Sequence, residues 1–139
     1  MFKNLMLTTM LAVALVTGGD AAQGQGLSEM LVLEGDPLNG VAGTFTDLGL
    51  VRLNNNGQVA FDGTLTGGSF GRGLFRAESG APLVTYVRSG DSTSNGTFGN
   101  FLISSLNNVG QISFSADLLG TSGGANDNRG YYIASAGTL

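Results

Sequence analysis

The chain has 139 residues, a net charge of −4 and 24 glycines, and it contains neither cysteine nor histidine. The absence of thiol and imidazole groups excludes Ser-His and Cys-His nucleophile pairs, thiolate-imidazole zinc sites and haem ligation by either residue. The few arginines are scattered and form no basic stripe that could neutralise phosphates, which argues against a nucleic-acid partner.

The N-terminus reads as an export signal. Lys3 supplies the positive charge, an apolar run interrupted only by two threonines extends from Leu5 to Val16, and small residues follow. A transmembrane anchor is the rival interpretation, but it needs about 20 apolar residues. We expect residues 1–22 to be a cleaved signal peptide, with candidate cleavage points after Ala21, Ala22 or Gly24. The mature chain is then exported to the periplasm, cell surface or extracellular space, without an integral membrane span, and no cysteine is present to accept a lipid.

Residues 53–61 return in closely similar form as residues 106–114, about 53 positions later. The likeness extends on both sides, so that Leu74 corresponds to Tyr131 and the Gly-Asp pair at Asp36 to the pair at Asp91. Such a period predicts one supersecondary unit copied along the chain. We assign residues 27–82 to β-repeat 1 and residues 83–139 to β-repeat 2, which lacks its last strand.

Alternating apolar and polar residues within each copy predict β-strands. Val59, Phe61 and Leu65 fall on one face, whereas Ala60 and Asp62 fall on the other. We therefore expect an all-β chain whose sheets have one packed and one solvated face, with phenylalanines in the core. The expected strands cover residues 48–53, 58–65, 73–77, 83–88, 102–106, 111–118 and 130–135.

The turn inside the repeated segment can be predicted residue by residue. Asn56-Gly57 alone suggests a type I′ hairpin, but Val109 stands at the position of Asn56 in the second copy, and a β-branched residue resists positive φ. The shared solution is a type I turn closed by Gly57 or Gly110 in a left-handed bulge position. Asn54 and Asn107 are then placed to cap the backbone of their own turns.

A four-stranded meander at this period is typical of a propeller blade, and propellers close with about four or more blades. This chain offers two blade-like units, preceded by a leading strand expected over residues 30–34. That strand either supplies the strand missing from the second unit, or exposed strand edges pair between chains. The apolar run of the leading strand favours self-association.

The repeated motif resembles that of exported bacterial tandem-repeat proteins named for Asn-x-x-Gly-x-x-Ala-Phe, often called choice-of-anchor tandem-repeat proteins. The resemblance implies export, many such units and no established chemistry. Ser113 replaces the motif alanine in the second copy, and no C-terminal sorting anchor follows, so we expect a short or truncated member. The motif positions are Asn54, Gly57, Ala60 and Phe61, and Asn107, Gly110, Ser113 and Phe114.

Other polar clusters have structural readings that we favour over functional ones. Asp36 and Asp91 could hold calcium, but a loop aspartate more often bonds its own backbone. Asp62 and Asp117 occupy different registers and are interpreted as outward strand positions rather than paired acids for sugar hydrolysis. The glycine-rich segment 67–73 is expected to be a hairpin loop, and segment 123–130 departs from calcium-binding repeats.

The sequence thus predicts a non-enzymatic exported structural or interaction module with no catalytic residue, metal site or cofactor and an unknown ligand. The alternatives are a glycan-binding or small-ligand-binding module, with or without calcium, and a truncated fragment of a larger β-propeller.

Overall fold

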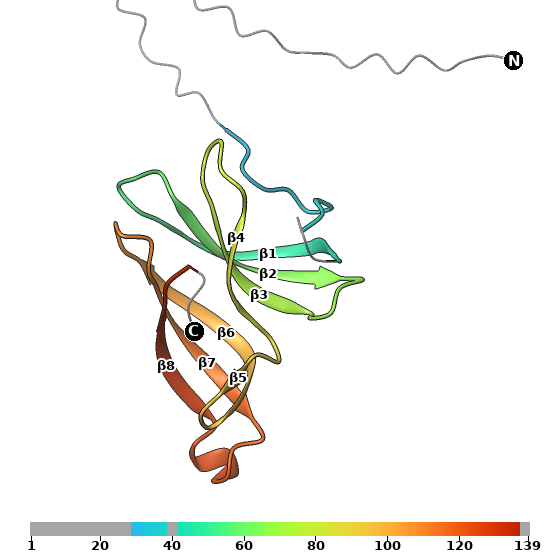
Figure 1. Ribbon diagram of the computed structural model, residues 1–139, viewed down its shortest axis with the longest axis vertical. Coiled ribbons are helices and arrows are strands. Elements are labelled where there is room, and N and C mark those ends of the chain that lie inside the picture. The colour runs from blue at the N-terminus through green and yellow to red at the C-terminus, as the bar shows by residue number, and fades with distance from the viewer. Residues whose placement is uncertain (1–28, 39–41, 137–139) are drawn as a thin grey trace, which may run out of the picture.

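The computed structural model describes residues 29–38 and 42–136, and the predicted signal peptide lies outside these residues. The fold is all-β, as expected, and consists of two four-stranded antiparallel sheets (Figure 1). The first sheet has the order β1-β2-β3-β4, and the second has the order β5-β6-β7-β8. Their bounds are β1 Thr44–Leu53, β2 Val59–Thr66, β3 Arg72–Ala77, β4 Val84–Arg88, β5 Ser92–Thr93, β6 Gly96–Leu106, β7 Ile112–Leu119 and β8 Arg129–Ala134, with a short 3-10 turn η1 at Gly124–Asn126.

The two long strands β1 and β6 begin earlier than the alternation predicts. β1 pairs with β2 through register shifts between Phe45 and Asp47 and between Leu48 and Val51. β6 carries a similar pair of shifts against β7. Each bulge interrupts the period of two, so the pattern shows only the final part of each strand.

Two hydrophobic cores hold the fold together. One lies on the outer face of the first sheet and includes Phe45, Phe61 and Phe75. The other lies between the sheets and combines residues of both, among them Leu74 and Val87 of the first sheet with Phe98 and Phe114 of the second. The predicted core role of the phenylalanines is confirmed, and β6 is the strand that lies against the first sheet.

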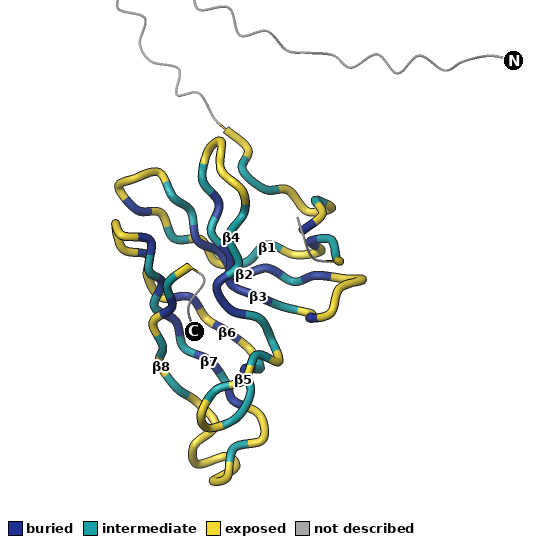
Figure 2. Tube along the Cα trace, in the orientation of Figure 1, coloured by how far each residue is buried: buried dark blue, intermediate teal, exposed yellow. Residues whose placement is uncertain are grey.

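The expectation of a solvated polar face is wrong for the first sheet. Ala60 and Leu74 are fully buried, and Asp62 is only 5% exposed, because this face packs on the second sheet (Figure 2). For the second sheet the expectation is confirmed along β7, where buried apolar residues alternate with more exposed polar ones. β8 alternates too, but its outward residues include the apolar side chains of Tyr131 and Ile133.

The leading strand expected over residues 30–34 is also wrong. Residues 30–33 have no regular secondary structure and residue 34 begins a turn, and the segment pairs with no strand in the described part of the chain; Pro37 forms an isolated bridge to Thr44. Leu31 and Val32 pack on the outer core of the first sheet, so the segment does not close onto β8. A strand needs a neighbouring backbone, and here the segment has only side chains beneath it.

Sheet and sequence repeat are offset by one strand. β4 falls within the second repeat by sequence correspondence, yet it pairs with β3 and completes the first sheet. Within the described residues, β8 is the last strand and forms an edge of the second sheet.

Candidate functional site

The repeated Asn-Gly turns have the predicted geometry. Gly57 and Gly110 have φ of 74° and 78°, and no other residue type has positive φ among the described residues. The Oδ1 atom of Asn54 accepts hydrogen bonds from the backbone N–H of Asn56 and of Gln58, both at 3.0 Å. Asn107 does the same in the second copy at 3.1 and 2.8 Å. Each asparagine therefore caps its own turn, as predicted.

The two turns also bond to each other, which the sequence does not reveal. The Nδ2 atom of Asn54 donates to the carbonyl oxygen of Asn107 at 2.8 Å, while Asn56 Nδ2 donates to the carbonyl of Asn108 at 2.7 Å. Asn108 returns the contact, since its Oδ1 accepts from the backbone N–H of Asn55 at 3.1 Å. These hydrogen bonds between the two motif turns join consecutive units. We call them the asparagine ladder, of which this pair of turns is one rung.

Two arginines and a tyrosine, which sequence reasoning missed, extend this seam. Arg52 Nε donates to the carbonyl of Ser104 at 2.8 Å. The Tyr86 hydroxyl donates to the carbonyl of Gly110, and Arg76 Nη1 donates to that hydroxyl at 3.2 Å. Burial raises the pKa of Tyr86, and the neighbouring Arg76 guanidinium partly offsets this. These side chains therefore link the first sheet to backbone carbonyls of the second unit by hydrogen bonds.

The two Gly-Asp loops are equivalent and bond internally. Asp36 Oδ2 accepts from the N–H of Leu33 at 2.9 Å, and Asp91 Oδ2 accepts from the N–H of Arg88 at 2.8 Å. The favoured backbone-bonding role is confirmed for both. Within the described residues, no group of three acidic side chains is arranged to hold a metal ion.

The carboxylates Asp62 and Asp117 are each paired with an arginine of the adjacent strand. Asp62 accepts from Arg72 at 2.5 Å and from the N–H of Leu50 at 2.7 Å. Asp117 accepts from Arg129 at 3.0 Å on the exposed side of the second sheet. The outward reading holds for Asp117 and is wrong for Asp62, which is buried and has its charge compensated within the first sheet.

The glycine-rich segments are connections. Residues 67–71 join β2 to β3 as a hairpin loop, as expected, with Gly67 at φ 73°. The loop after β7 contains η1, and Asp127 Oδ2 accepts from the N–H of Gly123 at 3.1 Å. This aspartate therefore also stabilises its own loop.

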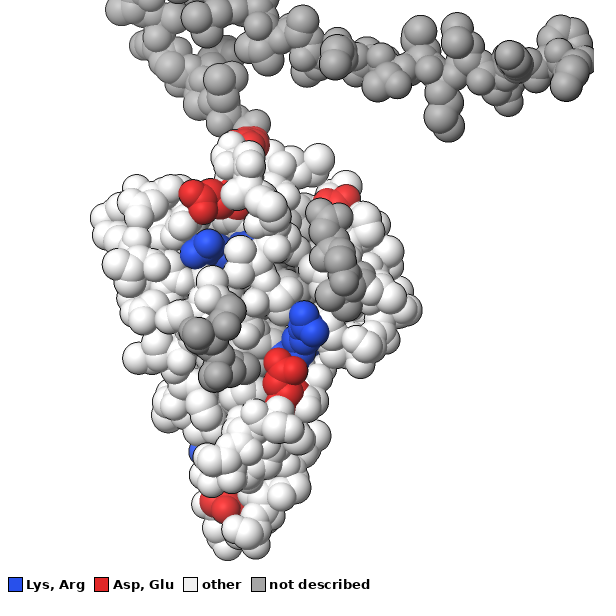
Figure 3. Space-filling view, in the orientation of Figure 1, with Lys and Arg blue, Asp and Glu red and all other residues white. Residues whose placement is uncertain are grey.

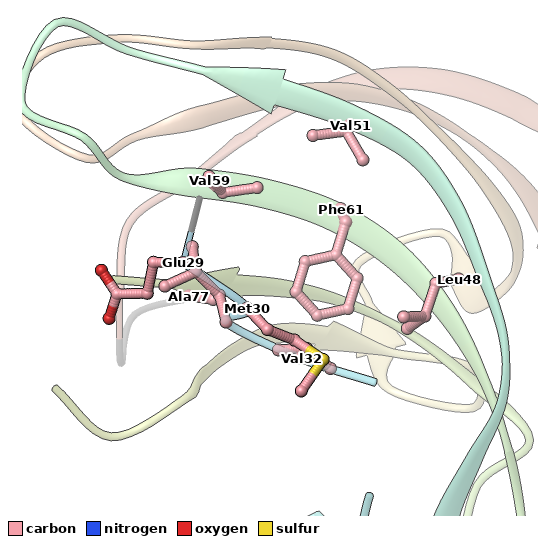
Figure 4. A pocket seen from close by; sticks show the side chains of 9 residues that line it. Glu29, Met30, Val32, Leu48, Val51, Val59, Phe61 and Ala77 are labelled. Carbon is pink, nitrogen blue, oxygen red and sulfur yellow. The ribbon is translucent and has the colours of Figure 1, made fainter. Parts of the chain in front are cut away.

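An apolar hollow of about 280 Å³ lies on the outer face of the first sheet (Figure 4). Phe61 points into it between the strands and the segment that begins at Glu29. The lining from the sheet is Leu48, Val51, Val59, Phe61 and Ala77. In the sequence, this surface is indicated by Val59 and Phe61, which fall on the apolar face of one expected strand.

A second apolar surface lies on the outer face of the second sheet. Tyr131 and Ile133 are 85% and 72% exposed, and Leu102 lies in the same cross-strand row as Tyr131 through Ser115. The sequence signal for this surface is the presence of two large residues at positions where strand alternation predicts solvent.

On the face of the molecule shown in Figure 3, the charged side chains form a few small groups on a largely uncharged surface. Among the helices of the described residues, none has the length and apolar character to cross a membrane.

The chain belongs to a family of unknown function, DUF7453, whose model matches residues 13–139. The search of curated proteins found no match. The search of solved structures found none either.

Proposed function

We propose that the chain is an exported, non-enzymatic β-repeat protein that acts as a structural or interaction module. The observation that supports this most is the contrast between its polar and apolar groups. The repeated asparagines and aspartates bond to their own turns, to an arginine or to the next unit, whereas both outer sheet faces carry apolar surface. Exposed apolar patches of this kind suit contact with another protein.

The N-terminal pattern of Lys3, an apolar run and small residues supports export. Fractionation of producing cells, followed by intact-mass measurement, tests this part. We expect the protein outside the cytoplasm, shortened by about 21 to 24 residues. Protein recovered outside the cytoplasm with Met1 retained would contradict it.

The alternative of a calcium-assisted ligand module is tested on the same material by thermal melts with calcium and with a chelator. The module proposal predicts equal melting temperatures, because Asp36 and Asp91 already accept backbone hydrogen bonds in their own loops. A calcium-dependent rise that Asp36→Asn and Asp91→Asn abolish would favour the alternative.

A further inference from the structure

Positions that correspond in the two repeats have opposite exposure. Leu74 faces the second sheet and is fully buried, whereas its counterpart Tyr131 is 85% exposed. Likewise Arg76 bonds across the junction through Tyr86, whereas its counterpart Ile133 is 72% exposed. The outer face of the second sheet is therefore the same repeat surface that the first sheet uses for packing, but no sheet of the described residues covers it. We name it the tail face, comprising Leu102, Ser113, Tyr131 and Ile133.

The complementary surface is present at the other end of the chain. Val51 pairs with Phe61 across β1 and β2, just as Ile103 pairs with Phe114 across β6 and β7. Ile103 is 1% exposed beneath the first sheet, whereas Val51 is 54% exposed. We name this surface the head face, comprising Leu48, Val51, Val59, Phe61 and Ala77 around the apolar hollow. It corresponds to the face of the second sheet that the first sheet covers.

The strand edges match in the same way. β4 pairs with β3 and also delivers Tyr86 and Val87 to the core of the next sheet. Its repeat counterpart is the segment of residues 29–33, which delivers Leu31 and Val32 to the core of the first sheet. Both segments lead into equivalent loops: Gly35 N–H donates to the Phe45 carbonyl and Gly90 N–H to the Phe98 carbonyl, each at 2.7 Å.

β4 and segment 29–33 differ in whether they have a strand to pair with. In the described residues, segment 29–33 pairs with no strand, and β8 has no strand beyond it. Inside the chain, the strands that correspond to these two edges, β4 and β3, pair with each other.

The asparagine ladder has a free end at the tail face. Asn54 Nδ2 donates both to Gln58 and to the carbonyl of Asn107. Asn107 Nδ2 donates to Gln111, and within the described residues it makes no hydrogen bond to a further turn. The second N–H of Asn107 is therefore available for the next asparagine turn.

We propose that copies of this chain associate head to tail, with the head face of one copy packed on the tail face of another as the second sheet packs on the first. This inference rests on the proposed interaction-module function and names its partner as a second copy. Segment 29–33 of the second copy then pairs antiparallel with β8. Transferring the β3–β4 register places its Val32 opposite Tyr131 and its Met30 opposite Tyr132.

Such a contact is heterologous, because each copy contributes two different surfaces. A linear series of copies keeps one free head face and one free tail face until it closes into a ring. Propellers close with about four to eight blades, and each copy supplies two sheets. We therefore expect a closed ring of about two to four copies.

The test uses one blocking variant for each face. Val51→Glu places a charge in the head face, and Ile133→Glu places one in the tail face. Both sites are exposed in the single chain, so the variants should fold. Ser122→Glu, in the exposed loop after β7, is the matched control. Light scattering over a concentration series should show an assembly for the wild-type and control proteins and a monomer for each blocking variant.

Mixing the two blocking variants is the decisive step. Val51→Glu keeps an intact tail and Ile133→Glu keeps an intact head, so the mixture should form a two-chain species and stop there. A concentration-independent monomer of the wild-type protein would overturn the inference, as would an assembly that survives either substitution or a mixture that stays monomeric. Export and the response to calcium are measured in separate experiments. A failure of the proposed function can therefore be told apart from a failure of this inference.

Discussion

The two sheets are built from the same repeat, yet strands β2 and β3 of the first sheet are buried on both faces, whereas their counterparts β7 and β8 are buried on one. In β3 the residues Gly73, Leu74 and Phe75 are buried in succession, whereas the corresponding strand β8 alternates between exposed and less exposed residues. The difference does not come from the strands themselves, which share turns and pairing. It comes from what lies next to each sheet, so burial in this fold depends on a unit's neighbours.

The same comparison explains the polar groups of the junction. The Asn54 side chain is buried and donates a hydrogen bond to the following turn, whereas the Asn107 side chain is exposed and donates within its own turn. Asp62 is buried with Arg72, whereas Asp117 meets Arg129 near solvent. Matched substitutions at corresponding positions therefore measure how much a neighbouring unit contributes to the free energy of unfolding.

The largest contrast is expected between Leu74 and Tyr131. Leu74→Ala should lower the free energy of unfolding by about 2 to 5 kcal/mol, because it leaves a cavity between the sheets. Tyr131→Ala should change it by less than about 0.5 kcal/mol in dilute, monomeric protein. Urea unfolding monitored by circular dichroism measures both, and equal effects would contradict the packing of the first sheet on the second.

The asparagine ladder gives the next effect. Asn54→Asp keeps the oxygen that caps the turn but removes the N–H that reaches the Asn107 carbonyl. We expect a loss of about 1 to 3 kcal/mol, since the hydrogen bond between the turns is lost and a carboxylate oxygen faces the Asn107 carbonyl, which keeps its bond from the Gly110 N–H. Asn107→Asp should cost less, because that side chain is exposed and donates only to Gln111. Chemical denaturation of the pair in parallel tests this order, and the reverse order would refute the inter-unit rung.

Substitutions at the bulge glycines should have a smaller effect. Gly57→Ala should cost about 1 to 2 kcal/mol, because alanine is strained in the left-handed conformation. Gly110→Ala should cost more, since its added Cβ would meet the Arg76 guanidinium. Gly71→Ala is the control, because Gly71 has open space and no positive φ. Thermal melts that rank Gly71→Ala as the most damaging would disprove the turn assignment.

The smallest predicted effect is a pH dependence at Tyr86. Its folded-state pKa is raised by burial, so the protonated hydroxyl favours the folded state. The associated stability is complete below the ordinary tyrosine pKa of about 10 and is lost as the pH rises through the folded-state pKa. Tyr86→Phe should lack this component, so its unfolding free energy should fall less steeply in alkali. Identical alkaline profiles for the two proteins would contradict the assignment.

Local features were predictable because their causes are local. The Asn54 cap and the left-handed Gly57 follow from the chemistry of a few consecutive residues, and the second copy with Val109 removed the competing turn type. The backbone-bonding role of Asp36 has the same origin.

Features that depend on a neighbour could not be predicted. The alternation around Ala60 and Asp62 reads as one solvated face, and nothing in those residues says that another sheet covers it. The apolar run at Met30 reads as a strand, but pairing requires an adjacent strand edge, and none lies there in the described part of the chain. Arg52 bonds to backbone carbonyls of β6, and backbone acceptors leave no signature in the sequence.

Within the described residues, corresponding positions of the two units differ in burial because the first sheet packs on a following sheet and the second does not. Hydroxyl-radical footprinting of dilute protein, with each rate normalised to the intrinsic reactivity of its side chain, tests this directly. We expect strong protection of Leu74 and little protection of Tyr131, with Tyr131 becoming protected as the protein concentration rises. Equal protection of the two residues in dilute protein would contradict it.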